Sequence, residues 1–211
     1  MDWITNTALL LFVLWTSLTL HEFAHAWAAW RLGDDTARRE GRLTLNPLAH
    51  IDPVGTFLLP VLGIPFGWAR PVPIDPRRFR RDVDMGYGIA VSAAAGPASN
   101  LLLTAVTAPL CALSIAAQAP DLVTSVLLIL AIVNVHLAAF NMIPVVPLDG
   151  SRVADHLVPG PLRQAYAAIR EQSLLVMILF FLVFPRIGLD PFAPLRDLVL
   201  GTIRALVPLF S

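Results

Sequence analysis

Three long stretches of the sequence contain no Asp, Glu, Lys or Arg: residues 3–21, 85–120 and 122–148. A helix needs about 20 apolar residues to cross the hydrocarbon core of a bilayer. A soluble domain of this size could not bury so much apolar surface, because 56% of the residues are hydrophobic and only 14% are charged. The sequence therefore predicts an all-α polytopic membrane protein.

We expect about five to six transmembrane helices. Their predicted positions are, in chain order, residues 3–30, within 85–118, 122–143, 173–184 and 195–210. The last of these carries three charged side chains, so the sequence leaves open whether this helix crosses the membrane or lies along its surface.

The apolar run at 56–68 is too short to cross the membrane as a helix. It is interrupted by Pro60, Gly63, Pro65 and Gly67. If this run enters and leaves on one side, the arginine-rich segments at 31–53 and 70–84 both lie in the cytoplasm, as the positive-inside rule requires. We therefore expect a re-entrant or β-like membrane loop after the first helix. Its following arginines are expected to contact anionic lipid and not nucleic acid.

The first span contains the sequence HEFAH at residues 21–25. On a helix, His21 and His25 lie on one face about one turn apart, a spacing at which two imidazoles can hold one Zn²⁺. Glu22 can reach a zinc-bound water as general base. Unpaired polar groups within a membrane span cost several kcal/mol, so a metal ion or a carboxylate partner is expected beside them.

A catalytic zinc site needs a third protein ligand and one open position. The candidates are His50, Asp52, His136, Asp149 and His156. Depth favours Asp149, because it follows the cytoplasmic end of the third span, while His21 and His25 lie near the cytoplasmic end of the first. The prolines and the glycine beside Asp149 allow the backbone to form a pocket. His50, in a loop on the same side, is the next candidate.

Four motifs together resemble the site-2 protease family of intramembrane zinc metalloproteases, peptidase family M50. They are HEFAH at 21–25, GRLTLNPLAHIDPVGT at 41–56, GPASN at 96–100 and FNMIPVVPLDG at 140–150. The second motif resembles the compact prokaryotic branch of the family, which has no PDZ or CBS domain. The resemblance implies one zinc per chain, held by His21, His25 and Asp149, with Glu22 as the catalytic base.

The resemblance also implies that Asn100 lies close to the metal and that Asn141 lies near the substrate strand. An amide side chain there can donate to a developing oxyanion or hold an extended substrate; the alternative for both is hydrogen bonding between helices. His50 either borders the active site or is a loop histidine bonded to backbone. Residues 1–211 are expected to form a single membrane-embedded protease domain, with a catalytic core at about 3–150 and C-terminal helices at 173–211.

The expected reaction is hydrolysis of peptide bonds within transmembrane segments of membrane proteins. Such a substrate must unwind locally, and the loop at 56–68 could gate its entry or pair with it. We expect an integral protein of a prokaryotic inner membrane, in contact with lipid, with its active site toward the cytoplasm. The alternative is a non-proteolytic protein that binds or transports a divalent metal, but transporters more often contain repeated halves with broken helices.

Overall fold

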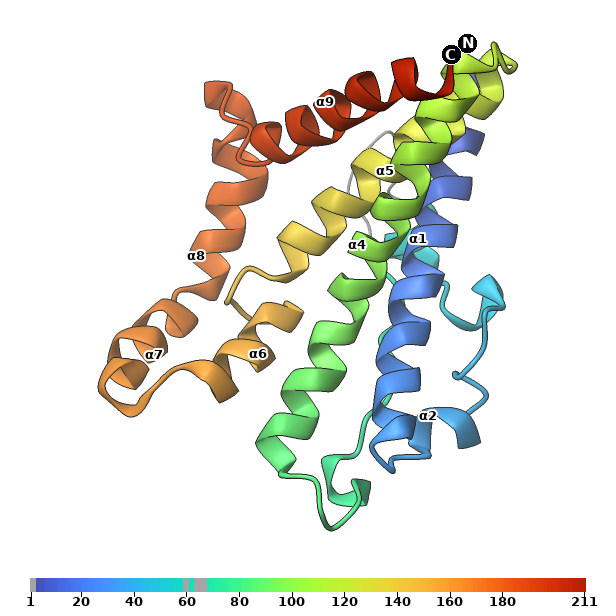
Figure 1. Ribbon diagram of the computed structural model, residues 1–211. Coiled ribbons are helices and arrows are strands. Elements are labelled where there is room, and N and C mark those ends of the chain that lie inside the picture. Colours follow the sequence, from blue (N-terminus) through green and yellow to red (C-terminus); the bar gives the residue numbers. More distant parts are fainter. Residues whose placement is uncertain (1–2, 59–60, 63–67) are drawn as a thin grey trace.

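Three long helices form the centre of the protein, as the ribbon diagram shows (Figure 1). They are α1 (Trp3–Arg31), α4 (Met85–Ala116) and α5 (Asp121–Asn141) in the computed structural model, which describes residues 3–58, 61–62 and 68–211. All three are long and apolar enough to cross a membrane. α4 packs extensively against both of the others, while α1 and α5 contact each other much less, so α4 is the middle member of the bundle. These helices correspond to the first three predicted spans.

The remaining helices are shorter. The α-helices are α2 (Thr36–Arg39), α6 (Asp149–Leu157), α7 (Arg163–Glu171), α8 (Ser173–Ile178) and α9 (Ala193–Phe210). Short 3₁₀ or π turns occur at Pro47–Ala49, Pro53–Leu58, Pro76–Arg78, Gly160–Leu162, Leu179–Val183 and Pro185–Ile187. The described residues contain no β-strand, so the all-α prediction is confirmed for them. Spanning helices beyond the first three stay a prediction.

Local signals in the sequence explain where the long helices begin and end. The carboxylate of Asp84 accepts a hydrogen bond of 2.8 Å from the backbone N–H of Tyr87 and so caps α4. After α1, Gly33 adopts a φ of +114°, and a Cβ there would lie 2.8 Å from the backbone nitrogen of Arg80. Only glycine fits this turn, which brings the polar segment before α4 back against the end of α1.

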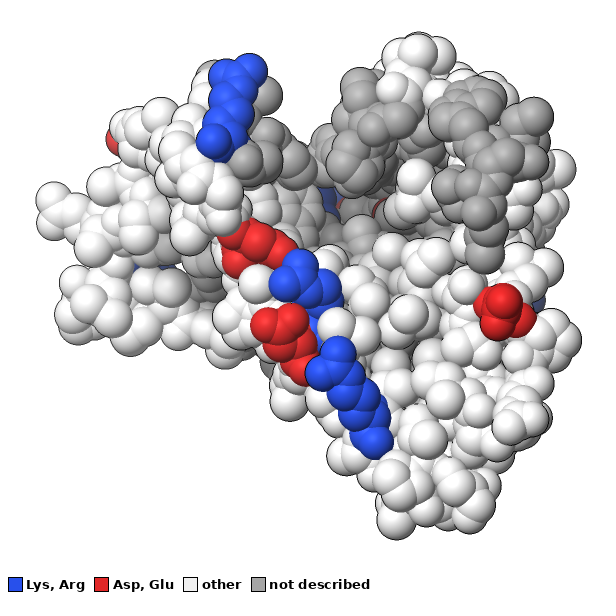
Figure 2. Space-filling view, turned by 90° about the horizontal axis from the view of Figure 1, so that it is seen from above, with Lys and Arg blue, Asp and Glu red and all other residues white. Residues whose placement is uncertain are grey.

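α9 lies across α4 and α5 at the end of the molecule where both termini are found (Figure 1). Val199 and Ile203 of α9 pack against a core of small side chains that includes Cys111, Ala112 and Ala131. Figure 2, which views this end, shows a band of acidic and basic side chains across the middle of a mostly uncharged face, with further charged groups apart from the band toward the edges. A helix with a charged stripe facing outward favours the alternative in which this segment lies along the membrane surface.

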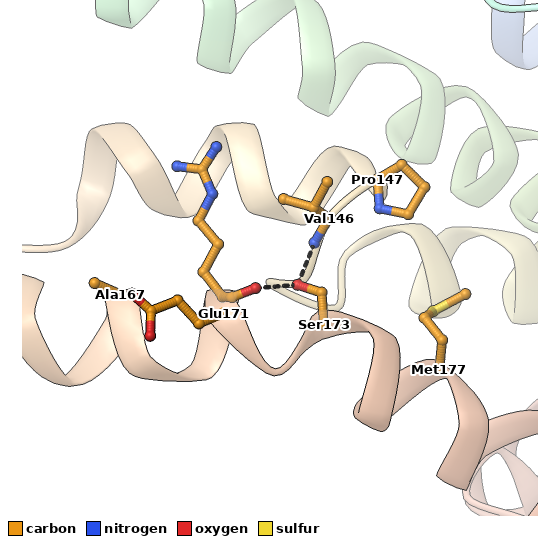
Figure 3. Close-up of a pocket in the computed structure, with 7 residues that line it drawn as sticks. Val146, Pro147, Ala167, Glu171, Ser173 and Met177 are labelled. Carbon is orange, nitrogen blue, oxygen red and sulfur yellow. Dashed lines mark hydrogen bonds between the residues drawn. The ribbon is translucent and has the colours of Figure 1, made fainter.

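Helices α6, α7 and α8 form an arm beside the bundle (Figure 1). The turn Leu179–Val183, which continues α8, touches α5 through aromatic rings, with the centroids of Phe140 and Phe180 5.5 Å apart. An open pocket of about 600 Å³ lies where α7 and α8 meet the loop before α6. There the hydroxyl of Ser173 accepts a hydrogen bond from the Val146 N–H and donates one to the Arg170 carbonyl (Figure 3). These bonds hold the loop before α6 against the arm.

The expected re-entrant loop at 56–68 begins and ends at one point. The hydroxyl of Thr56 donates a 2.8 Å hydrogen bond to the Trp68 carbonyl, and the Trp15 indole of α1 donates to the Thr56 carbonyl at 3.1 Å. A helical crossing of this length would instead separate its ends by about 18 Å. The prolines and glycines at Pro60, Gly63, Pro65 and Gly67 lie outside the described residues, so the depth of the loop stays a prediction.

Residues 69–75, which we call the covering segment, return from this loop along α1. At one end the Arg70 N–H donates to the His50 carbonyl at 2.9 Å. At the other end the Asp75 N–H donates at 2.7 Å to the carboxylate of Asp34, which is buried just after α1. The covering segment is therefore fixed at both ends, and its middle lies over the motif of α1.

Candidate metal centre

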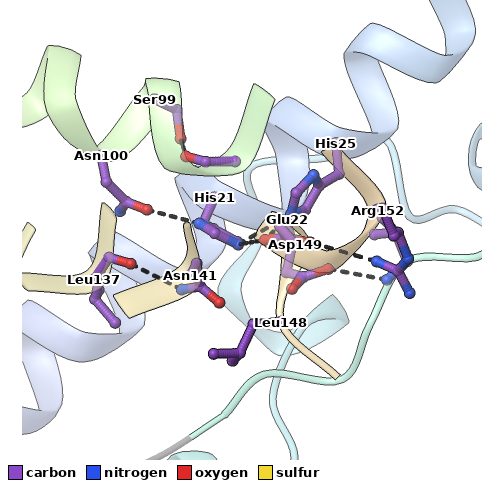
Figure 4. A network of polar contacts seen from close by, with 12 residues as sticks. His21, Glu22, His25, Ser99, Asn100, Leu137, Asn141, Leu148, Asp149 and Arg152 are labelled. Carbon is purple, nitrogen blue, oxygen red and sulfur yellow. Dashed lines mark hydrogen bonds and ion pairs between the residues drawn. The ribbon is translucent and has the colours of Figure 1, made fainter. Parts of the chain in front are cut away.

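Two imidazoles and one carboxylate meet between α1 and the start of α6 (Figure 4). The Nε2 atoms of His21 and His25 lie 2.9 Å apart, and the Oδ2 atom of Asp149 lies 3.2 Å from the first and 3.3 Å from the second. All three side chains are buried. The structure thus brings together the two motif histidines and the third ligand that depth favours, although 128 residues separate His21 from Asp149.

The outer nitrogens of both imidazoles are already used. The Nδ1–H of His25 donates to the backbone carbonyl of Ser92 at 2.7 Å, and the Nδ1 of His21 lies 2.6 Å from the amide oxygen of Asn100. A neutral imidazole that donates from Nδ1 presents a lone pair at Nε2. Two such lone pairs therefore face each other and the Asp149 carboxylate, an arrangement that is repulsive unless a proton or a cation lies between them.

This donor set fits zinc. Nitrogen and oxygen ligands at the usual 2.0–2.2 Å from a tetrahedral zinc lie about 3.3 Å from one another, close to the three separations above. Burial alone would raise the pKa of the Asp149 carboxyl, but its closeness to His21 and His25 lowers this pKa below its ordinary value. The ionised carboxylate is the form in which Asp149 can bind a metal.

Gly96 of α4 makes the room that the imidazoles occupy. A Cβ at this position would lie 2.4 Å from Nε2 of His25 and 2.7 Å from Cε1 of His21. Gly150 has a similar role beside Asp149, since a Cβ there would lie 2.3 Å from the Met142 carbonyl oxygen. Both glycines of the sequence motifs thus permit close approach and do not themselves carry chemistry.

Glu22 lies beside the two imidazoles but faces the covering segment. A ring nitrogen of His21, a ring nitrogen of His25 and a carboxylate oxygen of Glu22 all lie within 4.8 Å of one another. At this separation one water can hydrogen-bond to the carboxylate and also lie beside the nitrogens. The Oε2 atom of Glu22 accepts a hydrogen bond of 2.9 Å from the backbone N–H of Val72. This bond holds one carboxylate oxygen in place, and the side chain is buried.

The other ligand candidates lie elsewhere. His50 is buried and its Nε2–H donates to the Thr44 carbonyl at 2.9 Å, as in the alternative of a backbone-bonded loop histidine. Asp52 accepts hydrogen bonds from the N–H groups that follow it in its own loop. The ring of His136 stacks on Phe192, and the ring of His156 meets that of Tyr87 edge to face.

The two candidate asparagines differ in their surroundings. Asn100 is buried, and its amide bonds His21 through oxygen and Asn134 through nitrogen, at 2.6 Å each. This favours a role in holding His21 over contact with a substrate. Asn141, at the end of α5, donates to the Leu137 carbonyl at 2.9 Å and is only partly buried (Figure 4), so it stays a candidate for substrate contact.

Sequence reasoning missed two groups near the centre. One is Asn134, a buried amide in the apolar helix α5; its polar side chain in a membrane span was the available signal. The other is the Val72 N–H, which no side-chain pattern could reveal because it belongs to the backbone.

Comparisons with known proteins agree with this centre. The family profile described as Peptidase family M50 matches residues 103–185. A Bacillus subtilis protein named as a zinc metalloprotease, YwhC, is 38% identical over 179 residues, which cover 82% of this chain and 79% of the relative. Proteins named as zinc metalloprotease Rip2 are 33% identical in Mycolicibacterium smegmatis and 28% identical in Mycobacterium tuberculosis H37Rv, and the matches cover 62% and 63% of their lengths. No solved structure matches the chain.

Proposed function

The chain belongs to peptidase family M50 and is a zinc metalloendopeptidase, and from this premise we propose that it cleaves peptide bonds within transmembrane segments of membrane proteins. The observation that carries the proposal is the convergence of two imidazole lone pairs and a carboxylate beside Glu22, on a helix apolar enough to span a membrane. We propose that residues 1–211 act as one membrane-embedded domain.

His21, His25 and Asp149 would hold one zinc ion per chain. Bound there, zinc would supply Lewis-acid activation of water and of the scissile carbonyl. Glu22 would take the proton from the attacking water and deliver it to the leaving amine, as a general base and then a general acid. The Val72 N–H would keep the Glu22 carboxylate turned toward this position, since it binds one oxygen and leaves the other for the water.

The depth of the centre would give water a short path. Trp27 and Trp30, near the end of α1, are partly exposed, and the guanidinium carbons of Arg31 and Arg38 lie 5.8 Å from their respective ring centroids. Tryptophan and arginine side chains of this kind gather at the membrane–water interface. His21 lies six residues before Trp27, about 9 Å deeper along the helix. We propose that this interface faces the cytoplasm of a prokaryotic cell.

An unwound substrate strand would lie between the loop at 56–68 and the centre. The covering segment has prolines at positions 71 and 73, which offer no N–H for strand pairing. The N–H between them, at Val72, is already bound by Glu22. We therefore propose that the substrate pairs with the loop or lies near Asn141 at the end of α5, and not along the covering segment.

The test uses the full chain in lipid vesicles with a single-pass membrane protein as substrate, comparing wild type with Glu22→Gln. We expect both to bind one zinc per chain and Glu22→Gln to cleave about 10²–10⁴-fold more slowly. Glu40→Gln, at an exposed glutamate outside the centre, is the matched control and should cleave like wild type. A Glu22→Gln variant that cleaves at the wild-type rate would refute the assigned role, and zinc binding without any cleavage by wild type would favour a metal-binding protein.

A further inference from the structure

Asn134 is a buried amide that the proposed reaction does not use. It lies on α5 among apolar neighbours and has no exposed surface, like Asn100 and Ser17, its partners on the other two long helices. A polar side chain within a membrane span is costly unless its donors and acceptors are all paired. The hydrogen-bond partners of the Asn134 amide therefore indicate the role of this side chain.

The orientation of Asn134 follows from groups that can only accept. Its amide nitrogen lies 2.8 Å from the backbone carbonyl of Leu130 and 2.8 Å from the hydroxyl oxygen of Ser17. The Ser17 hydroxyl donates its own hydrogen to the Val13 carbonyl at 2.7 Å, so it can only accept from Asn134. The Leu130 carbonyl, and the Val13 carbonyl acting through Ser17, thus require the NH₂ group of Asn134 to be on the side that faces α1. The oxygen of Asn134 then points toward α4.

The orientation of Asn134 determines that of Asn100, and the orientation of Asn100 determines that of His21 in the metal centre. The oxygen of Asn134 accepts from the amide nitrogen of Asn100 at 2.6 Å, and that nitrogen also lies 3.5 Å from the Ser17 carbonyl. The oxygen of Asn100 must then face the Nδ1 of His21, 2.6 Å away, which places the imidazole proton on Nδ1. Nε2 of His21 is left with its lone pair toward His25 and Asp149.

We propose that Asn134 is a positioning residue that, through Asn100, holds His21 in the tautomer and ring orientation that bind the metal. This inference rests on the proposed zinc site and adds to it a residue two hydrogen bonds away from the ligand. A group that accepts a hydrogen bond from the other ring nitrogen of a metal-bound histidine fixes the tautomer and makes the histidine a more basic ligand. Loss of such a group costs about 10–100-fold in metal affinity. A residue one step further out is expected at the lower end of that range.

The competing explanation is that Asn134 only ties α5 to its neighbours. Thr104 of α4 provides the matched control, because its hydroxyl donates to the Ala131 carbonyl of α5 at 3.1 Å and is also buried. It joins the same two helices one turn away from Asn100 and Asn134, but its bond ends at a backbone carbonyl and does not continue to the metal centre. A purely structural role predicts the same consequences for Asn134→Leu and Thr104→Val.

The experiment measures zinc affinity by chelator competition, and the visible spectrum of the Co²⁺-loaded form, for the full chain in detergent. Asn134→Leu should weaken zinc binding about 10-fold and alter the Co²⁺ bands, while Thr104→Val should match wild type in both. Combining Asn134→Leu with Asn100→Leu should weaken binding no more than Asn100→Leu alone, because Asn134 acts through Asn100. If Asn134→Leu does not fold, Asn134→Ser, which cannot serve both partners, is measured with the same expectations.

Wild-type affinity and an unchanged Co²⁺ spectrum in the Asn134 variant would overturn the inference, as would fold-changes that multiply in the double variant. Absence of zinc binding by wild type would instead refute the proposed function, so the two failures are distinguishable.

Discussion

Replacing Gly96 with alanine should separate zinc binding from fold stability. The added Cβ would lie 2.4 Å from Nε2 and 2.5 Å from Cε1 of His25, and 2.7 Å from Cε1 of His21. Ordinary contacts of a Cβ begin at about 3.4 Å, so an imidazole or the whole of α1 must move by about 1 Å. Zinc–nitrogen bonds of about 2.0–2.1 Å do not tolerate such a shift within the same set of ligands.

The size of the effect follows from the cost of overpacking. Inserting a methyl group into a packed site costs about 1–3 kcal/mol, and each 1.4 kcal/mol corresponds to a factor of ten in a binding constant. Zinc affinity should therefore fall about 5- to 150-fold. Glycine to alanine within a helix stabilises the helix itself by about 0.5–1 kcal/mol. Without zinc the imidazoles are not held by a metal and can move away from the added methyl group, so the thermal stability of the metal-free variant should change little.

The assay is chelator competition for zinc affinity, together with thermal unfolding of the metal-free protein. Gly201→Ala in α9 is the control, since a Cβ there meets nothing within 4 Å, and its zinc affinity should equal that of wild type. A Gly96→Ala variant that binds zinc as tightly as wild type would refute the reasoning, because the imidazoles would then not occupy the space opposite Gly96.

Two further predictions concern the segments around Glu22. Val72→Pro removes the N–H that binds the Glu22 carboxylate and should lower the cleavage rate about tenfold, which is the value of one charge-assisted hydrogen bond; its zinc content should not change. Val72→Ala keeps the N–H and should cleave at the wild-type rate. Equal cleavage rates for the two variants would contradict the role of this N–H. Thr56→Val removes the hydroxyl that joins the ends of the loop at 56–68, and limited proteolysis should then cut the loop faster while zinc affinity stays the same; unaltered proteolysis would show that the hydroxyl does not close the loop.

The parts of the fold that the sequence predicts are those governed by length, charge and helical spacing. The three long spans follow from uncharged stretches, and His21 and His25 share a face because four residues make about one helical turn. Asp149 follows from a comparison of depth at the expected cytoplasmic ends of two spans. These arguments need no knowledge of how one helix is rotated against another, and the structure contains the three long helices and places Asp149 beside the two histidines.

The contacts that the sequence does not predict depend on rotation and on backbone groups. Asn134 meets Asn100 only because α4 and α5 pack with these faces together, which the largely apolar sequence of α5 does not determine. The covering segment has no periodicity, so nothing in its side chains indicates that the Val72 N–H reaches Glu22. The orientation of α9 likewise required its packing partners, since its length and its charges allow both alternatives.

The most direct test of the account is zinc K-edge X-ray absorption of the purified full chain. The account predicts one zinc per chain, bound by two imidazole nitrogens and a carboxylate oxygen at about 2.0–2.2 Å with one further light ligand. Replacing His21, His25 or Asp149 with alanine should remove this spectrum. Sulfur scattering near 2.3 Å, or a spectrum that survives all three replacements, would contradict the central claim.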